Sequence, residues 1–259
     1  MNYKSLFYSA TVVFVLGCQT SPTGRKQLLL VKDPDMNTMG VQAFEEMKKK
    51  TPIDTGEAVN RYVNCIVNAE LQVTEDETGV ESWEVVVFRD STPNAFALPG
   101  GKIGVHTGIL PVAKTVDQLA AVLGHEIGHV IARHGNERVS QNQIAGGAQS
   151  IVKALGKEQA AGVLGAGMQY GVLLPFSRTH ESEADIVGLD IMSKAGFDPR
   201  ESVTLWKNMS ALGGSKTNEF LSTHPSDETR IKQLNEKMSE SLQKYQIAKS
   251  NGKQPNCKL

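Results

Sequence analysis

The chain has 259 residues, and its 27 basic and 28 acidic side chains leave a formal net charge of -1 at pH 7. Because the two signs are balanced, there is no single-sign field to attract nucleic acid, and we expect no nucleic-acid partner. The hydrophobic fraction of 40% and the charged fraction of 21% are typical of a globular protein. A chain of this length buries one good core, so we expect a single folded domain.

The N-terminus resembles a bacterial lipoprotein signal. Lys4 supplies a positive charge before the apolar run 6–16, which is about 11 residues long against the roughly 20 that cross a bilayer. Residues 15–18, Val-Leu-Gly-Cys, resemble a lipobox, in which the cysteine is acylated after cleavage. We therefore predict a lipoprotein signal peptide over 1–17, with Cys18 as the lipidated residue.

Lipid chains on Cys18 would give a stable membrane anchor, because two or three acyl chains bind a membrane stably, whereas a single chain does not. Gln19 resembles the residues that permit sorting to the outer membrane, and the segment 18–30 is expected to be a lipid-anchored tether. We expect a periplasm-facing lipoprotein of the bacterial outer membrane. The alternative is a secreted protein in which the cysteine is incidental.

Two helices and a small sheet are predicted before the middle of the chain. Apolar residues at helical spacing indicate amphipathic helices over 36–49 and 58–71. Stretches rich in β-forming residues then indicate a small antiparallel sheet. Its strands are expected over 83–89, 94–98 and 102–106, the last two joined by the Pro-Gly-Gly turn at 99–101.

Residues 115–134 form the clearest predicted helix. Thr115 is a typical N-cap, Gln118 completes a capping box, and Gly135 follows the expected end. Apolar residues cover so much of the circumference of this helix that it is expected to be buried on several sides.

The second half of the chain reads as mostly helical. Segment 145–171 is rich in glycine and alanine, which favours tightly packed helices, with a mobile flap over the site as the alternative. The other predicted helices span 181–195, 199–212 and 225–247. The domain is expected to cover 31–250, followed by a loosely ordered tail over 251–259.

With Cys18 assigned to lipid, Cys65 and Cys257 remain in a compartment that permits disulfides. A bridge between these two cysteines would clamp the C-terminal tail to an early helix. The alternative is a pair of independent free thiols.

His125, Glu126 and His129 form a His-Glu-x-x-His motif in the middle of the strongest helix. The i, i+4 spacing puts both imidazoles on one face, where they suit one tetrahedral zinc ion. Glu126 lies roughly 100° around the axis, where its carboxylate reaches a metal-bound water without replacing a ligand. If the histidines served only as packing, Glu126 would be buried unpaired at a cost of about several kcal/mol. We therefore predict one Zn2+ per chain, with Glu126 as the general base.

A third zinc ligand is expected from the acidic cluster that follows Ser177. Glu181 and Asp185 share one helical face, so Glu181 would bind the metal while Asp185 accepts the free N–H of a ligand histidine. Glu183 is the competing ligand, although it points to the other side of the helix, and His180 is either a ligand or a donor near the substrate. The alternative is a solvated acidic helix face.

The pairing of His-Glu-x-x-His with a downstream Glu-x-x-Ala-Asp resembles the gluzincin peptidases that include the CAAX prenyl endopeptidase Ste, HtpX and the mitochondrial Oma protease. The likeness is greatest to periplasmic lipoprotein peptidases of the BepA, LoiP and YcaL type. The resemblance implies that Glu181 is the third ligand, Asp185 its supporting partner and 94–98 an edge strand that pairs with substrate. The shared features also include Pro99-Gly100-Gly101, Ser177-Arg178 and Thr223-His224-Pro225.

The expected fold is α+β and predominantly helical, a zincin-like catalytic domain with a small antiparallel sheet beside the active-site helix. Unlike the Ste and HtpX branches, the chain is expected to lack several membrane helices, and unlike BepA it is expected to lack a helical repeat domain. The substrate would add to the sheet as a β-strand, through main-chain hydrogen bonds that recognise an extended chain and not a particular sequence. The predicted substrate-binding residues are Asn94, Ala95, Phe96, Ala97 and Arg178.

His224 is the first candidate for a catalytic donor to the oxyanion, with Arg178 and His180 behind it. Two alternatives stay open for His224, namely a fourth zinc ligand that holds the resting enzyme inactive, and a surface histidine before a helix start. The expected function is zinc-dependent cleavage of unfolded or misassembled proteins in the periplasm. The alternatives are an assembly factor for outer-membrane proteins with secondary proteolysis, and a structural lipoprotein with a vestigial metal site.

Overall fold

The computed structural model describes residues 18–154, 176–211, 223–224 and 228–259. The predicted signal peptide 1–17 lies outside this part of the chain, as do residues 155–171 of the glycine-rich segment. The elements in chain order are β1 (Cys18–Thr20), β2 (Lys26–Leu28), α2 (Asp33–Lys50), α3 (Glu57–Leu71), β3 (Glu84–Phe88), β4 (Ala95–Leu98), β5 (Lys102–His106), η1 (Thr107–Ile109), α4 (Val116–Ile131), α5 (His134–Ala154), α6 (Arg178–Ala195), α7 (Arg200–Ala211) and α9 (Glu228–Ser250).

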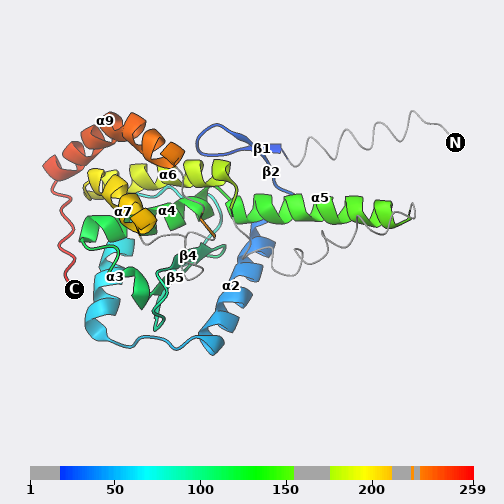
Figure 1. Ribbon diagram of the computed structural model, residues 1–259, viewed down its shortest axis with the longest axis horizontal. Coiled ribbons are helices and arrows are strands. Elements are labelled where there is room, and N and C mark those ends of the chain that lie inside the picture. The colour runs from blue at the N-terminus through cyan, green and yellow to red at the C-terminus, as the bar shows by residue number, and fades with distance from the viewer. Residues whose placement is uncertain (1–17, 155–175, 212–222, 225–227) are drawn as a thin grey trace.

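The predicted α+β, predominantly helical class is confirmed, with α4 in the middle of the molecule and α3, α6 and α7 around it (Figure 1). The main sheet has the order β3-β5-β4. The predicted antiparallel hairpin is β4–β5, whereas β3 pairs with β5 in parallel, so the sheet is mixed. The turn at Gly100 and Gly101 has positive φ angles of 81° and 69°, which glycine adopts without strain. This topology leaves β4 as an edge strand.

Helix α4 begins as the sequence predicts but ends early. The Thr115 side chain accepts a hydrogen bond from the Gln118 backbone N–H at 3.2 Å, which caps the helix. The expected end at residue 134 is wrong, because α4 stops at Ile131 and Arg133 takes a left-handed φ of 55°. The Arg133 side chain bonds Asp33 at 3.0 Å and the Glu77 carbonyl at 2.6 Å, contacts that stabilise this break. Gly135 therefore lies inside α5 and does not cap α4.

Close packing of α4 against α6 positions the acidic cluster. A Cβ placed on Gly188 would come within 2.6 Å of the His125 backbone nitrogen, and one on Gly124 within 3.0 Å of the Gly188 carbonyl oxygen. Because both positions are glycine, the two helix backbones approach closely at this level. The carboxylates of α6 therefore reach the side chains of the motif on α4.

Both ends of the described chain pack against the domain. Ser21, Gln27 and Leu29 are buried, so segment 18–30 is not an extended tether but the β1–β2 hairpin beside α5 and α6 (Figure 1). Cys65 and Cys257 form a disulfide, and Cys257 is buried. The expectation of a loosely ordered tail is therefore wrong. Among the described helices, none combines the length and the apolar character that a bilayer span requires.

Candidate metal centre

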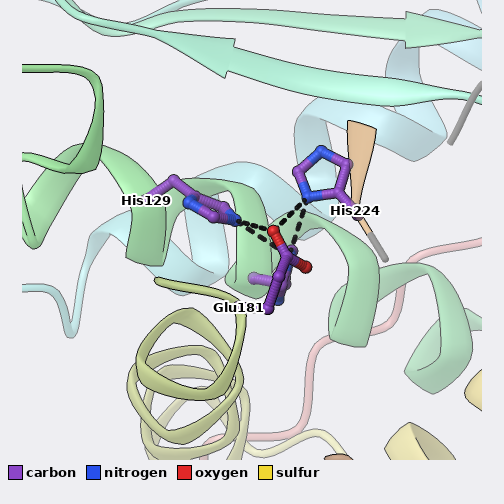
Figure 2. A group of neighbouring side chains, drawn as sticks. His129, Glu181 and His224 are labelled. Carbon is purple, nitrogen blue, oxygen red and sulfur yellow. Dashed lines mark hydrogen bonds and ion pairs between the residues drawn. The ribbon is translucent and has the colours of Figure 1, made fainter. Parts of the chain in front are cut away.

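Four side chains converge at the junction of α4, α6 and the segment 223–224. His125, His129, Glu181 and His224 are all buried, and one potential ligand atom from each lies within 4.8 Å of the others. Figure 2 shows His129, Glu181 and His224 pointing toward one another, with contacts that meet at the Glu181 carboxylate. The predicted residues His125, His129 and Glu181 are thus brought together, and His224 is not a surface histidine.

The spacing of the four groups fits a tetrahedral ion. With metal–ligand bonds of about 2.0–2.1 Å, neighbouring ligand atoms lie roughly 3.3–3.4 Å apart. The His125 Nε2 atom is 3.4 Å from Glu181 Oε2, and His129 Nε2 is 3.4 Å from Glu181 Oε1. His125 Nε2 and His129 Nε2 are 3.0 Å apart, with their Nδ1 atoms bonded elsewhere. Two facing imidazole nitrogens beside a carboxylate are the donor set that zinc prefers, so these residues fit the metal.

The imidazole of His125 is held from the C-terminal side of the chain. His125 Nδ1 donates to Asp185 Oδ1 at 2.9 Å, which leaves Nε2 as the metal-facing atom. Arg230 donates to both Asp185 oxygens at 2.6 and 2.7 Å, lies 2.8 Å from Glu181 Oε2 and stacks over Trp206. Asp185 therefore has the partner that was predicted for it. Arg230 was not predicted as part of the site, because nothing in the sequence distinguishes it from the other charged residues of a polar helix.

The imidazole of His129 is held through a residue that the sequence analysis also missed. His129 Nδ1 is 2.9 Å from His134 Nδ1, and His134 Nε2 is 3.1 Å from Glu183 Oε2. Burial lowers the pKa of His134 to about 4, so this ring is neutral at neutral pH. The only sequence signal for His134 is its position shortly after the motif, just beyond the helix break.

Three other predicted candidates lie outside the converging group. Glu183, the competing ligand, contacts His134 and Arg25 on the other side of α6, so the structure does not place it with the histidine pair. His180 bonds Glu137 Oε2 at 3.0 Å and is likewise outside the group. Arg178 is exposed in the first turn of α6.

Glu126 occupies the side of α4 that faces the edge strand. Its Oε2 atom accepts a hydrogen bond from the Ala97 backbone N–H at 3.2 Å, and its Oε1 atom is 3.5 Å from His224 Nε2. Burial raises the pKa of Glu126 above its usual range. For Glu181, burial opposes ionisation but is outweighed by His224, His125 and His129, so its pKa is lowered. One carboxyl is thus suited to take up a proton, and the other stays an anion.

A cleft of about 260 Å³ opens beside Glu126 along β4. Asn94, Phe96 and Ala97, three of the predicted substrate-binding residues, line it together with His224. Ala95 is fully buried in the hydrophobic core and is not among the residues that line the cleft.

Comparison with known proteins assigns the chain to a family. The model of "Peptidase family M48" matches residues 57–238, which include the motif helix and all four converging side chains. The chain belongs to peptidase family M48. The four converging side chains within the matched residues could hold a metal ion.

Relatives span both organelles and bacteria. "Mitochondrial metalloendopeptidase OMA1" of Schizosaccharomyces pombe is 44% identical over 169 residues, which cover 64% of this chain and 50% of that protein. "Metalloendopeptidase OMA1, mitochondrial" of Danio rerio is 32% identical over 258 residues, 92% of this chain and 54% of that protein. The "Beta-barrel assembly-enhancing protease" of Escherichia coli is 27% identical over 206 residues, which cover 74% of this chain and 42% of that protein. The chain spans about half the length of these curated relatives.

The expected place at a bacterial outer membrane is contradicted by these comparisons. The relatives from Schizosaccharomyces pombe, Arabidopsis thaliana and Saccharomyces cerevisiae, 37–44% identical, all carry mitochondrial names. The prediction of the compartment rested on a short N-terminal pattern, whereas these similarities extend over 166 to 173 residues.

Proposed function

We propose that the protein is a zinc-dependent endopeptidase that cleaves unfolded or misassembled polypeptides and so serves protein quality control. The observation that carries this proposal is the position of Glu126. Its carboxylate lies between the converging histidine and glutamate side chains and the backbone N–H of an edge strand, at 3.2 Å from Ala97 N. A base, a metal site and a peptide-binding edge therefore meet in one cleft.

His125, His129 and Glu181 would hold the zinc ion, which lowers the pKa of a bound water to about 7 when it is present. Glu126 takes the proton from the attacking water and passes it to the leaving amine, a role that suits a buried carboxyl with a raised pKa. Asp185 fixes the tautomer of His125 through the 2.9 Å hydrogen bond to Nδ1.

His224 has two proposed roles that belong to two states of the enzyme. Its Nδ1 atom lies 3.1 Å from Glu181 Oε1 and 3.3 Å from His125 Nε2, a position that supports a fourth ligand in the resting enzyme. Its Nε2 atom lies 3.5 Å from Glu126 Oε1, on the side of the cleft. When substrate enters, we infer that His224 leaves the ligand group and donates to the oxyanion.

The substrate is proposed to bind as an added strand along β4. The Asn94 carbonyl accepts from the His106 N–H at 3.0 Å, and alternation along an antiparallel pair then turns the backbone groups of Ala95 and Ala97 away from β5. The Ala97 N–H accordingly points to Glu126. Main-chain pairing of this kind selects extended chains over particular sequences, which suits unfolded polypeptides.

A lipid anchor at Cys18 is a further part of the proposal. Cys18 has an exposed free thiol and is the first residue of β1 in the packed β1–β2 hairpin. Acylation would therefore hold the domain close to the membrane surface. Metabolic labelling with an alkyne fatty acid tests this, since the wild type is expected to take up label and a Cys18→Ser variant is expected to take up none.

The Glu126→Gln variant tests the catalytic assignment. We expect it to retain stoichiometric zinc while its cleavage of casein falls by about 100-fold or more. Glu57→Gln is the matched control, because Glu57 is exposed at the start of α3, and it should cleave like the wild type. Cleavage of casein by Glu126→Gln at the wild-type rate would show that another group is the base. If Glu126→Gln still supports assembly of an outer-membrane β-barrel protein into vesicles, the assembly-factor alternative is favoured.

A further inference from the structure

We propose that the β1–β2 hairpin is a positioning part of the metal centre, acting on His129 through Glu183 and His134. The inference rests on the proposed function in one respect, namely that His129 is a metal ligand. Ser21, Thr23 and Arg25 of the hairpin are the residues that we assign to this support.

The hydrogen bonds from His129 outward have one consistent direction. A metal-binding Nε2 carries no proton, so the proton of His129 is on Nδ1, which donates to His134 Nδ1 at 2.9 Å. His134 then carries its own proton on Nε2 and donates to Glu183 Oε2 at 3.1 Å. Because each ring has only one donor and one acceptor, the position of the Glu183 carboxylate fixes the tautomer and the plane of both rings.

The Glu183 carboxylate is in turn fixed by the N-terminal hairpin. The hydroxyl of Ser21 donates to Oε1, the hydroxyl of Thr23 donates to the same oxygen at 2.5 Å, and Arg25 Nε donates to Oε2 at 2.9 Å. With the bond from His134, every one of these partners is a donor, and Glu183 is 3% exposed. The carboxylate is therefore held as an anion in one orientation, at a sequence separation of 158 to 162 residues from the hairpin.

A second contact from the hairpin holds the face of the His134 ring. Arg25 also donates to both oxygens of Glu137, at 2.9 and 2.6 Å. Glu137 bonds His180 Nε2 at 3.0 Å, and the His180 ring stacks on His134 with centroids 4.5 Å apart. Arg25 thus bridges the two carboxylates that limit how the His134 ring can rotate. His180, which is not a member of the ligand group, has a place in this support.

This arrangement predicts an effect on the metal that exceeds the effect on folding. A partly buried ion pair is weak evidence for stability, because its desolvation offsets its attraction. An outer partner of a ligand histidine, in contrast, typically changes metal affinity about 10–100-fold when it is lost. The hairpin variants are therefore expected to fold and to bind zinc less tightly.

The first experiment compares Arg25→Ala with Lys26→Ala in the full chain. Lys26 is the matched control, since it is exposed in the same hairpin and its ammonium group donates to Thr20 Oγ1, away from Glu183 and Glu137. Zinc affinity is measured by competition with a chromophoric chelator, alongside the thermal midpoint of the zinc-free protein and kcat and KM at saturating zinc. Arg25→Ala should lose about 10–100-fold in zinc affinity with KM unchanged, and Lys26→Ala should match the wild type.

A second set of variants keeps the inference testable if Arg25→Ala fails to fold. His134→Phe removes both hydrogen bonds and keeps the ring, whereas His134→Gln retains one acceptor and one donor. In the Co2+-substituted protein the phenylalanine variant should shift the visible absorption of the metal, and the glutamine variant should restore part of the wild-type spectrum. Arg25→Lys, which can pair with one carboxylate at a time, should lie between wild type and Arg25→Ala.

Two outcomes separate this inference from the proposed function. If the wild type holds no stoichiometric metal, the proposed function itself is wrong. If the wild type holds metal and Arg25→Ala and His134→Phe bind it equally tightly, with unchanged Co2+ spectra and only a lower thermal midpoint, the hairpin is merely structural and the positioning inference is overturned.

Discussion

The two histidines of α4 are supported from opposite ends of the chain, and the two supports follow the same principle. On the C-terminal side, Arg230 of α9 neutralises Asp185, which bonds His125 directly. On the N-terminal side, Arg25 of the β1–β2 hairpin neutralises Glu183, which contacts His129 only through the ring of His134. In each case an arginine fixes a carboxylate, and the carboxylate fixes the ring of a histidine.

The difference between the supports lies in burial and in length. The Arg230 side chain is 3% exposed and is stacked 3.7 Å over Trp206, whereas the Arg25 side chain is 22% exposed. The C-terminal support has one hydrogen bond between carboxylate and ligand ring, and the N-terminal support has two. A charge buried so deeply is costly to leave unpaired, so the C-terminal support is expected to matter for folding as well as for the metal.

The largest effect is expected for Arg230→Met. The substitution leaves Asp185 and Glu181 buried without their cation, so the free energy of unfolding should fall by about 3–5 kcal/mol. Zinc content and proteolysis should be lost together, unlike in Arg25→Ala. Urea unfolding and metal analysis measure both effects. Arg200→Met is the control, because Arg200 is 66% exposed and pairs only locally with Asp198; equal losses in the two variants would contradict the comparison.

An intermediate effect is expected from the disulfide, which constrains the C-terminal part of the chain and does not involve the β1–β2 hairpin. Cys65 and Cys257 are 192 residues apart, and the bridge ties the tail after α9 to α3. Replacing both by serine should lower the free energy of unfolding by about 2–4 kcal/mol, because the unfolded chain regains freedom. Urea unfolding of the variant is the measurement, and Cys18→Ser, which removes an exposed thiol, should show no change. An unchanged midpoint in the double variant would mean that packing alone holds the tail.

The smallest effect is expected at Glu70, a buried carboxyl that contacts the same helix at Gly124 but has no arginine. Within the described residues neither of its side-chain oxygens has a hydrogen-bond partner, and burial raises its pKa well above 4.5. The folded state therefore keeps this proton at pH values where the unfolded state loses it. The free energy of unfolding of the wild type accordingly falls as the pH rises above 4.5. Glu70→Leu should raise the free energy of unfolding at pH 8 by about 1–3 kcal/mol.

The pH dependence makes the Glu70 prediction specific. The gain from Glu70→Leu should shrink toward pH 5, because the carboxyl of the unfolded state begins to take up its proton there, and proteolysis should be unchanged. Urea unfolding at pH 5, 6.5 and 8 measures it. A gain that is the same at all three pH values would mean that Glu70 does not titrate above its unfolded value, and that a buried carboxyl here needs no arginine.

Much of the fold was predictable because it depends on local spacing. The predicted helices over 36–49 and 58–71 correspond to α2 and α3, and the strands over 94–98 and 102–106 to β4 and β5. The end of the motif helix was not predictable, because Arg133 is held in its left-handed conformation by Asp33, which is 100 residues away. The parallel pairing of β3 with β5 likewise depends on a crossover that spacing does not reveal.

In the metal centre, too, some features were predictable from local spacing and others were not. The sequence alone determined that His125 and His129 share a face of one helix, with Glu126 turned aside, and that Glu181 and Asp185 share a face of another, because helical geometry fixes residues one turn apart. Only the tertiary structure decided which arginine neutralises which carboxylate.

Those pairs join residues 45 positions apart for Arg230 and Asp185 and 158 positions apart for Arg25 and Glu183. No periodicity connects residues at such separations, since their meeting depends on how whole helices pack. Glycines at the contact of α4 and α6 bring the two helix backbones together, and the ends of the chain then supply the cations that complete the site.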